Sequence, residues 1–383
     1  MTGMDDTTGT TGMTGMSLLE ERYRRVLRLL PASYRTARED EMVSAFLEGS
    51  EGVVDDDNPR PRWSEVASVA ALSVRVRLGG IGAAPRFFAW GETVRLVALL
   101  GLAFQAALGY VTFGNGLQGY GLVGPAHPDY AAPFGDPGSA DRLWHVIRLA
   151  ADLLGPAAFV ALVLGRVQIA KAAALLGLAA AVYDVASAHA PGDVMLRSMA
   201  PVVLMLLVPV LALLAGFHRD APVVRRPLWV AALPIVAGCL LYGVLTVLGS
   251  MSLAPLIDVR VWPWIWPWMA PSGLACLAIL LASVAWAVRS GRARRSGRTG
   301  QTGRRPSVPL ALAILIVPVL LAMAASLNLT AVDPFSRTMT VMTVAQLTAL
   351  VVCGIALIVA GVRALPPSDA PAAGGIAMPD PAA

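Results

Sequence analysis

Two aspartates, Asp152 and Asp184, stand inside long apolar segments of this 383-residue chain. A carboxylate in hydrocarbon is costly, so such a residue is usually paired, protonated or in contact with water. Arg148 precedes Asp152 by one helical turn, a spacing that permits an ion pair, and Arg197 enters a later apolar segment from the same side. These four residues predict a polar site at the outer mouth of a helix bundle, for protons, cations or a small polar ligand. The alternative is a structural ion-pair cluster near the lipid headgroups.

The helix that carries Asp184 has a face of small residues. On a helical wheel Asp184 shares this face with Ala173, Gly177 and Ala181. Small residues four positions apart let a neighbouring helix approach closely in a membrane. Asp184 is therefore expected to point at another helix and not at lipid.

Other patterns for chemistry are missing from the sequence. No glycine-rich phosphate loop precedes Lys171, the only lysine, and the HExxH, GxSxG and H-x-E patterns are absent. The three cysteines lie inside apolar segments without a CxxC pair, which indicates packing residues and neither a disulfide nor a zinc site. The sequence therefore predicts no catalytic, cofactor or metal residue, and a protein that is not an enzyme.

About eight apolar segments are long enough to cross a membrane, since a hydrocarbon core about 30 Å thick needs roughly 20 helical residues. The composition agrees, with 56% hydrophobic and 14% charged residues. Spanning segments must be helical, because an open sheet edge would leave backbone groups unpaired in lipid. The expected spans are residues 96–113, 147–165, 169–188, 197–217, 228–248, 269–288, 308–327 and 343–362.

Arginines fall mostly on alternate connections between these segments. The stretch before the first span, the second, fourth and sixth loops and the end of the last span carry most of them. Because cytoplasmic loops hold the excess of Arg and Lys, both termini are predicted to lie in the cytoplasm of a bacterial cell. The net charge of +5 is then explained by topology and by contact with anionic lipid, and no nucleic-acid binding is predicted.

Three short amphipathic helices are predicted ahead of the first span. Ser17-Leu-Leu-Glu20 forms a capping box. Apolar residues then recur at helical spacing in three runs, which stop at Pro31, at Gly49 and at Gly79-Gly80. Three such helices can bury one small core.

These features give a predicted division of the chain. Residues 1–16 and 364–383 are expected to be disordered tails. Residues 17–80 are expected to form a cytoplasmic helical prefix domain, and residues 81–363 a transmembrane bundle.

The stretch RRVLRLLPASYRTAREDEMVSAFLEG (residues 24–49) carries a Leu-Arg-Leu-x-Pro pattern followed by Tyr-Arg and an acidic-Glu-Met. It resembles the small helical prefix found before the membrane spans of bacterial permease-like proteins. The whole chain is similar to uncharacterised actinomycete integral membrane proteins with this prefix. The resemblance implies a regulatory or assembly domain, not an activity, and the chain departs from export permeases in lacking a large extracytoplasmic domain. The residues that carry it are Leu27, Arg28, Leu29, Pro31, Tyr34, Arg35, Glu41 and Met42.

The segment from Trp262 to Trp268 alternates tryptophan with proline on the predicted outer side. Tryptophan favours the headgroup region, and the prolines are expected to keep the segment extended. An interface anchor is predicted, with a stacking platform for a sugar or aromatic ligand as the alternative. Several spans also contain proline, which transporters use to break helices at binding sites but which is frequent in ordinary spans too.

The sequence as a whole predicts an all-α protein: a polytopic membrane helix bundle of about eight transmembrane helices with a small N-terminal cytoplasmic helical domain. We expect a permease-like or signalling component of the bacterial plasma membrane. Its partners would be the lipid bilayer and a cytoplasmic protein bound through residues 17–80. The alternative is a secondary transporter that uses Asp152 and Asp184.

Overall fold

The computed structural model describes residues 18–48, 62–80, 85–119, 139–187, 193–218, 227–253, 261–295, 306–327 and 333–366. Every regular element in these ranges is a helix, which confirms the all-α class. Residues 1–16 and 367–383 of the predicted tails lie outside the described residues. Ser17 of the capping box also lies outside them. The helices are α1 (Leu18–Leu27), α2 (Ala32–Glu48), α3 (Trp63–Arg77), α4 (Pro85–Gly119), α5 (Ala140–Ala151), α6 (Leu154–Val163), α7 (Val167–Ser187), α8 (Asp193–Gly216), α9 (Leu228–Leu253), α10 (Trp262–Met269), α11 (Pro271–Arg295), α12 (Ser307–Ala325) and α13 (Pro334–Arg363).

Helices α1, α2 and α3 surround a small apolar core. Leu27 is fully buried in it together with Val43 and Val69, one residue from each helix. The ring of Tyr23 stacks on that of Phe46, with ring centroids 3.9 Å apart. The apolar spacing that predicted these helices therefore corresponds to the faces that they bury against one another.

The end of α1 is held by α3. The carbonyl of Leu29, just beyond α1, accepts a hydrogen bond from the Ser73 hydroxyl at 2.6 Å and another from the Arg77 guanidinium at 3.1 Å. Carbonyls at a helix end have no donor within their own helix. Two side chains of α3 supply the donors here.

The end of α3 packs directly on the start of α4. Gly79 has a φ of +83°, in the left-handed region that suits glycine. Gly91 of α4 lies so close to the carbonyl of Leu78 that a Cβ would have no room. The three N-terminal helices are therefore attached to the rest of the chain by a packed contact as well as by the connecting residues.

Most of the remaining helices are long and apolar. Six segments of the described residues are long and apolar enough to span a membrane. Helices α7 and α8 contribute two shorter apolar stretches, Val167–Tyr183 and Val203–Gly216. These helices fit a multi-pass membrane protein. The six candidate spans are Pro85–Gln118, Leu143–Val163, Leu228–Ser250, Pro271–Arg292, Ser307–Ala325 and Pro334–Arg363.

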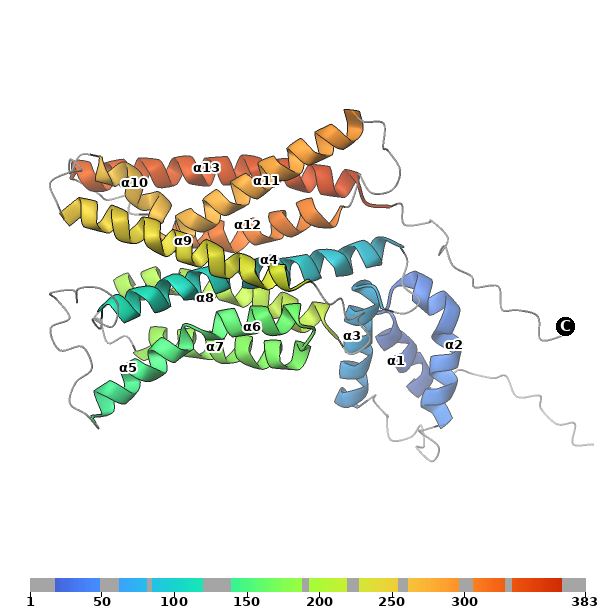
Figure 1. Cartoon of the computed structure of the whole chain (residues 1–383). Coiled ribbons are helices and arrows are strands. Elements are labelled where there is room, and N and C mark those ends of the chain that lie inside the picture. The colour runs from blue at the N-terminus through green and yellow to red at the C-terminus, as the bar shows by residue number, and fades with distance from the viewer. Residues whose placement is uncertain are drawn as a thin grey trace, which may run out of the picture.

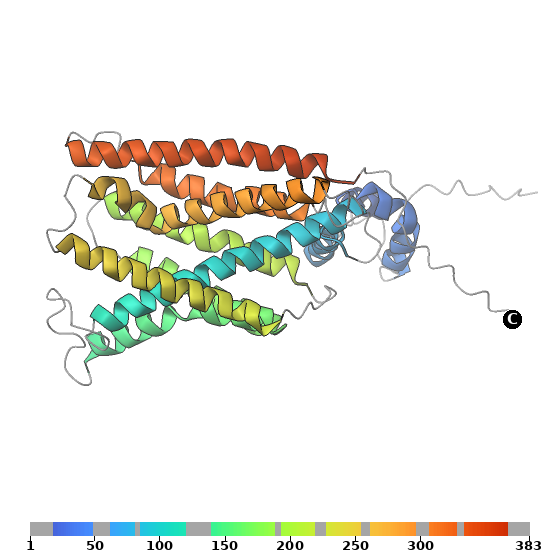
Figure 2. The ribbon, with the colours of Figure 1, turned by 45° about the horizontal axis from the view of Figure 1, so that its top comes forward.

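Helix α4 runs through the middle of the bundle and packs against α6, α8, α9 and α12. Figures 1 and 2 show it crossing from the end that carries α1–α3 to the opposite end, where α5 and α10 lie. One apolar core, containing Phe159 and Leu213, lies among α4, α6, α7 and α8. A second, containing Met323 and Leu350, joins α12 and α13 to α8 and α11.

Several helix ends gather at the end of the bundle that carries α1–α3. The start of α4, the end of α11, the start of α12 and the end of α13 all lie toward it (Figure 1). The Nε of Arg95 in α4 donates to the carbonyl of Gly216, the last residue of α8, at 3.1 Å. That bond supplies a donor to a carbonyl which has none within its own helix.

The second predicted span, residues 147–165, corresponds to the candidate span Leu143–Val163, but the helix there is interrupted. Helix α5 ends at Ala151, α6 begins at Leu154, and the residues between them form a turn. Pro156 explains the break, because it has no N–H for the carbonyl of Asp152 and its ring crowds that carbonyl. The Asp152 carbonyl faces Gly109 of α4 instead, where an added Cβ would come within 2.5 Å.

The expectation that the tryptophan-rich segment is extended is wrong. The segment forms helix α10, and Pro263 stands in its first turn, where a missing N–H breaks no helical bond. Ala270 then adopts an extended conformation (φ −60°, ψ 148°), as a residue before proline prefers. Pro271 therefore ends α10 and begins α11, and both segments remain helical.

Candidate functional site

Two of the four predicted site residues lie at the break between α5 and α6. Asp152 is half-buried in the turn, and Arg148 is exposed one helical turn earlier. The backbone N–H of Asp152 donates to the carbonyl of Arg148 at 3.2 Å. Asp184 belongs to α7 and Arg197 to α8, and the positions of these two side chains lie outside the described part of the structure. The four-residue polar site therefore stays a prediction.

The small-residue face of α7 meets a neighbouring helix, as its sequence predicts. Ala173 is buried, and a Cβ on Gly177 would lie 3.5 Å from the Cβ of Leu154 in α6. That is an ordinary van der Waals contact. The helix that carries Asp184 therefore packs on the helix that begins just after Asp152.

Gln105 of α4 pairs with a carbonyl of α8 that a proline leaves without its helical donor. In a regular helix Met205 would accept from residue 209, but Pro209 has no N–H. The Nε2 of Gln105 donates to the Met205 carbonyl at 3.3 Å. Gly101, one turn earlier on α4, lies so close to the ring of Pro209 that no Cβ would fit. Gly101 and Gln105 together accommodate the proline of α8.

The same arrangement recurs between α13 and α10. Gln346 is 1% exposed, and its Nε2 donates to the carbonyl of Pro267 at 3.4 Å. The residue four positions after Pro267 is Pro271, which again has no N–H. The Oε1 of Gln346 is buried and has no hydrogen-bond partner among the described residues. A buried acceptor left in this state costs about 1–3 kcal/mol, so a donor is missing at this point.

A cavity of about 270 Å³ borders Gln346, between α10, α11, α12 and α13. We refer to it as the hydroxyl-lined cavity, because serine and threonine side chains form much of its wall. None of the described residues that line it is charged. The lining residues are Trp266, Pro267, Ala270, Ser272, Met323, Ser326, Leu327, Ser336, Met339, Thr340, Thr343 and Gln346.

A second cavity, of about 130 Å³, lies between α4, α8, α11 and α12. Among its described lining residues Gln105 has the only polar side chain, and the Nε2 of that side chain is already bonded to Met205. This cavity has little to offer a polar ligand. The hydroxyl-lined cavity is therefore the better candidate for a functional site within the bundle.

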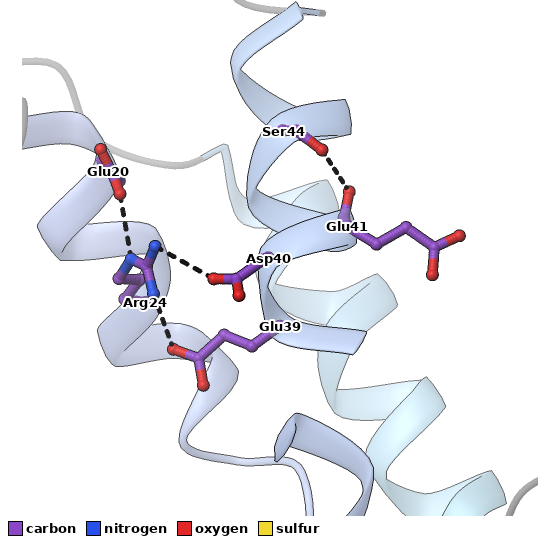
Figure 3. A network of polar contacts seen from close by, with 6 residues as sticks. All are labelled: Glu20, Arg24, Glu39, Asp40, Glu41 and Ser44. Atoms are coloured by element: carbon purple, nitrogen blue, oxygen red, sulfur yellow. Dashed lines mark hydrogen bonds and ion pairs between the residues drawn. The ribbon is translucent and has the colours of Figure 1, made fainter. Parts of the chain in front are cut away.

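The N-terminal helices carry a compact charged network (Figure 3). Arg24 of α1 contacts Glu20 of its own helix at 3.0 Å, and it contacts both Glu39 and Asp40 of α2 at 3.4 Å. The hydrogen bond that Arg24 donates to the Glu20 carboxylate, together with the neighbouring carboxylates, raises the pKa of Arg24. One cation thus joins α1 to α2 through two acidic residues, Glu39 and Asp40.

The described residues hold no group of three or more His, Cys, Asp or Glu side chains that could bind a metal ion. The sequence reasoning missed both glutamines, Gln105 and Gln346. A signal was available, because an amide inside an apolar span must find hydrogen-bond partners within the bundle. Prolines in neighbouring spans mark the carbonyls that need such a donor.

Comparison of the chain with protein-family models, with curated proteins and with solved structures finds no match.

Proposed function

We propose that this chain is a non-enzymatic, permease-like or signalling component of a bacterial plasma membrane, whose N-terminal helices bind a cytoplasmic partner. The observation that carries the proposal is the position of α1–α3 at one end of a bundle of apolar helices (Figure 1). The end of α3 is packed on α4, through Leu78 and Gly91. A partner bound to α1–α3 would therefore act on the bundle directly.

The proposal includes eight spans with both termini in the cytoplasm. Helices α7 and α8 supply two apolar segments in addition to the six candidate spans, and an even number returns the chain to its starting side. Arginines gather in the connections that follow α8 and α11, a single arginine (Arg166) follows α6, and Arg363 is the last residue of α13. The excess of arginine marks the cytoplasmic side.

Reporter fusions test this topology. Fusions at Asn115, Pro191, Ala254 and Val332 should report the outer side, and fusions at Arg219 and Gly300 the inner side. An outer signal from Gly300 would overturn the arrangement of eight spans.

The partner-binding role is tested with the full chain in membranes. A chain that lacks residues 17–80 should insert normally but lose a cytoplasmic protein that cross-links to the intact chain. Cross-linking of the same protein to both chains would contradict the assignment of the partner to α1–α3.

A secondary transporter is the second candidate, because the helix is broken between α5 and α6 at Asp152, and broken helices form binding sites in transporters. In that case Asp184→Asn should abolish ion-coupled uptake and leave thermal stability nearly intact. In a structural role the same change should lower stability modestly, since hydrogen bonds between spanning helices average well under about 2 kcal/mol.

A further inference from the structure

We propose that the hydroxyl-lined cavity binds a small neutral polyol, in the size range from glycerol to a monosaccharide. This inference goes beyond the proposed function and does not depend on the number of spans. It follows from the hydrogen-bonding state of the wall, from its lack of charge, and from the size of the cavity and its apolar surface.

Two hydroxyl groups of the wall, those of Thr343 and Ser326, present acceptors to the cavity. Thr343 donates its proton to the carbonyl of Met339 at 2.9 Å. Ser326 donates to the carbonyl of Met323 at 2.8 Å. A hydroxyl that donates to the backbone keeps its oxygen lone pairs free to accept. A ligand in this cavity must therefore donate hydrogen bonds.

Gln346 adds to this requirement. Its Nε2 is committed to Pro267, and its buried Oε1 is the acceptor that lacks a donor among the described residues. The cavity borders this side chain. A ligand hydroxyl that reaches the Gln346 side of the cavity would supply the missing donor.

The charge balance favours a neutral ligand over a cation. No described lining residue is a carboxylate, so a bound cation would be desolvated without a counter-charge. Ser272 and Ser336 lie in the first turns of α11 and α13, so the positive ends of two helix dipoles lie beside the cavity. Only one negative end, that of α12, lies beside it. An anion would in turn lack a basic side chain in the described wall.

The size and the apolar part of the wall limit the ligand further. A volume of about 270 Å³ corresponds to roughly nine water molecules at about 30 Å³ each. Trp266, Met323 and Met339 form apolar surface beside the hydroxyls. An aromatic face and thioethers suit a ligand that has a C–H surface as well as hydroxyl groups. Glycerol, inositol and hexoses have both.

Equilibrium binding to the purified full chain in detergent tests the proposal, with radiolabelled glycerol, myo-inositol and glucose as probes. At least one should bind saturably at millimolar concentration. Thr343→Val removes a lining hydroxyl and keeps the branched shape, and it should weaken binding roughly tenfold, the effect of one lost hydrogen bond. Thr343→Ser keeps the hydroxyl and should retain binding, which controls for damage to the fold.

The matched control is Thr338→Val, because Thr338 lies on the same helix and makes the same 2.9 Å bond, to Pro334, but does not line the cavity. It should leave binding unchanged. The proposal is overturned if none of the three polyols binds saturably, which is the result expected of a cavity that holds only water. It is equally overturned if Thr338→Val weakens binding as much as Thr343→Val, or if potassium or acetate displaces the bound polyol.

Discussion

The Nε2 of Gln105 lies 3.3 Å from the main-chain oxygen of Met205, which is 100 positions further along the chain. The bond joins α4 to α8 at the carbonyl that Pro209 leaves without a donor. A side chain from one helix thus replaces a backbone bond of another.

Gln105→Leu should destabilise the protein by about 1–3 kcal/mol, because it leaves the Met205 carbonyl buried without a donor. In a Pro209→Ala background residue 209 regains its N–H, so the same substitution should cost less. Denaturation in detergent of the wild type, the two single variants and the double variant measures the difference. Equal costs of Gln105→Leu in both backgrounds would show that the bond does not compensate for the proline.

Gly101→Ala should destabilise the bundle, because an added Cβ would collide with the ring of Pro209. Overpacking of a core typically costs about 1–3 kcal/mol. Gly243→Ala in α9 is the control, since nothing lies within 4 Å of a Cβ at that position. We expect Gly243→Ala to change the unfolding temperature little. A similar loss in both variants would contradict the close packing of α4 on α8.

Arg24→Met should loosen α1 from α2, because it removes the contacts with Glu39 and Asp40. Faster amide exchange in α1 and α2, with no change in the bundle, is the expected result. Arg25→Met is the control, because Arg25 contacts Glu21 of its own helix at 3.1 Å and both side chains are exposed. Exposed pairs of this kind contribute little. Identical exchange in the two variants would rule out a joining role for Arg24.

Asp333 should make stability depend on pH in acid. Its Oδ2 accepts the backbone N–H of Ser336 at 2.7 Å, and the hydrogen bonds from Ser336 lower the pKa of this carboxyl. The contribution is therefore complete above the unfolded value of about 3.9 and is lost as the pH falls through the lower folded value.

Asp333→Asn retains a capping acceptor but does not titrate. The variant and the wild type should unfold at similar temperatures at neutral pH. Below about pH 4, the unfolding temperature of the wild type should fall more steeply. Parallel curves for the two proteins throughout the acid range would mean that the cap does not depend on the charge of Asp333.

The three N-terminal helices could be predicted from the sequence because their limits are local. Pro31 separates α1 from α2, and Gly79 follows α3. The apolar residues between these limits recur at helical spacing throughout. Long apolar runs predicted the six candidate spans of the described residues in the same way, since length and hydropathy alone define them.

The tryptophan segment shows why local reasoning fails elsewhere. Pro263 fits an extended chain and the first turn of a helix equally well, so its presence could not decide between them. The break at Asp152 follows from Pro156, but the packing of the Asp152 carbonyl against Gly109 involves another helix. The Gln346–Pro267 bond joins residues 79 positions apart. None of these partners can be read from a window of neighbouring residues.

The contact between Gly91 and Leu78 makes α3 and α4 one mechanical unit. A partner that tilts α3 must displace the first turns of α4 or break that contact. Because α4 packs along α6, α8, α9 and α12, a tilt of α4 would shift the crossing angles of four helices together. Force applied at the N-terminal helices would then reach the distant end of the bundle along a single helix.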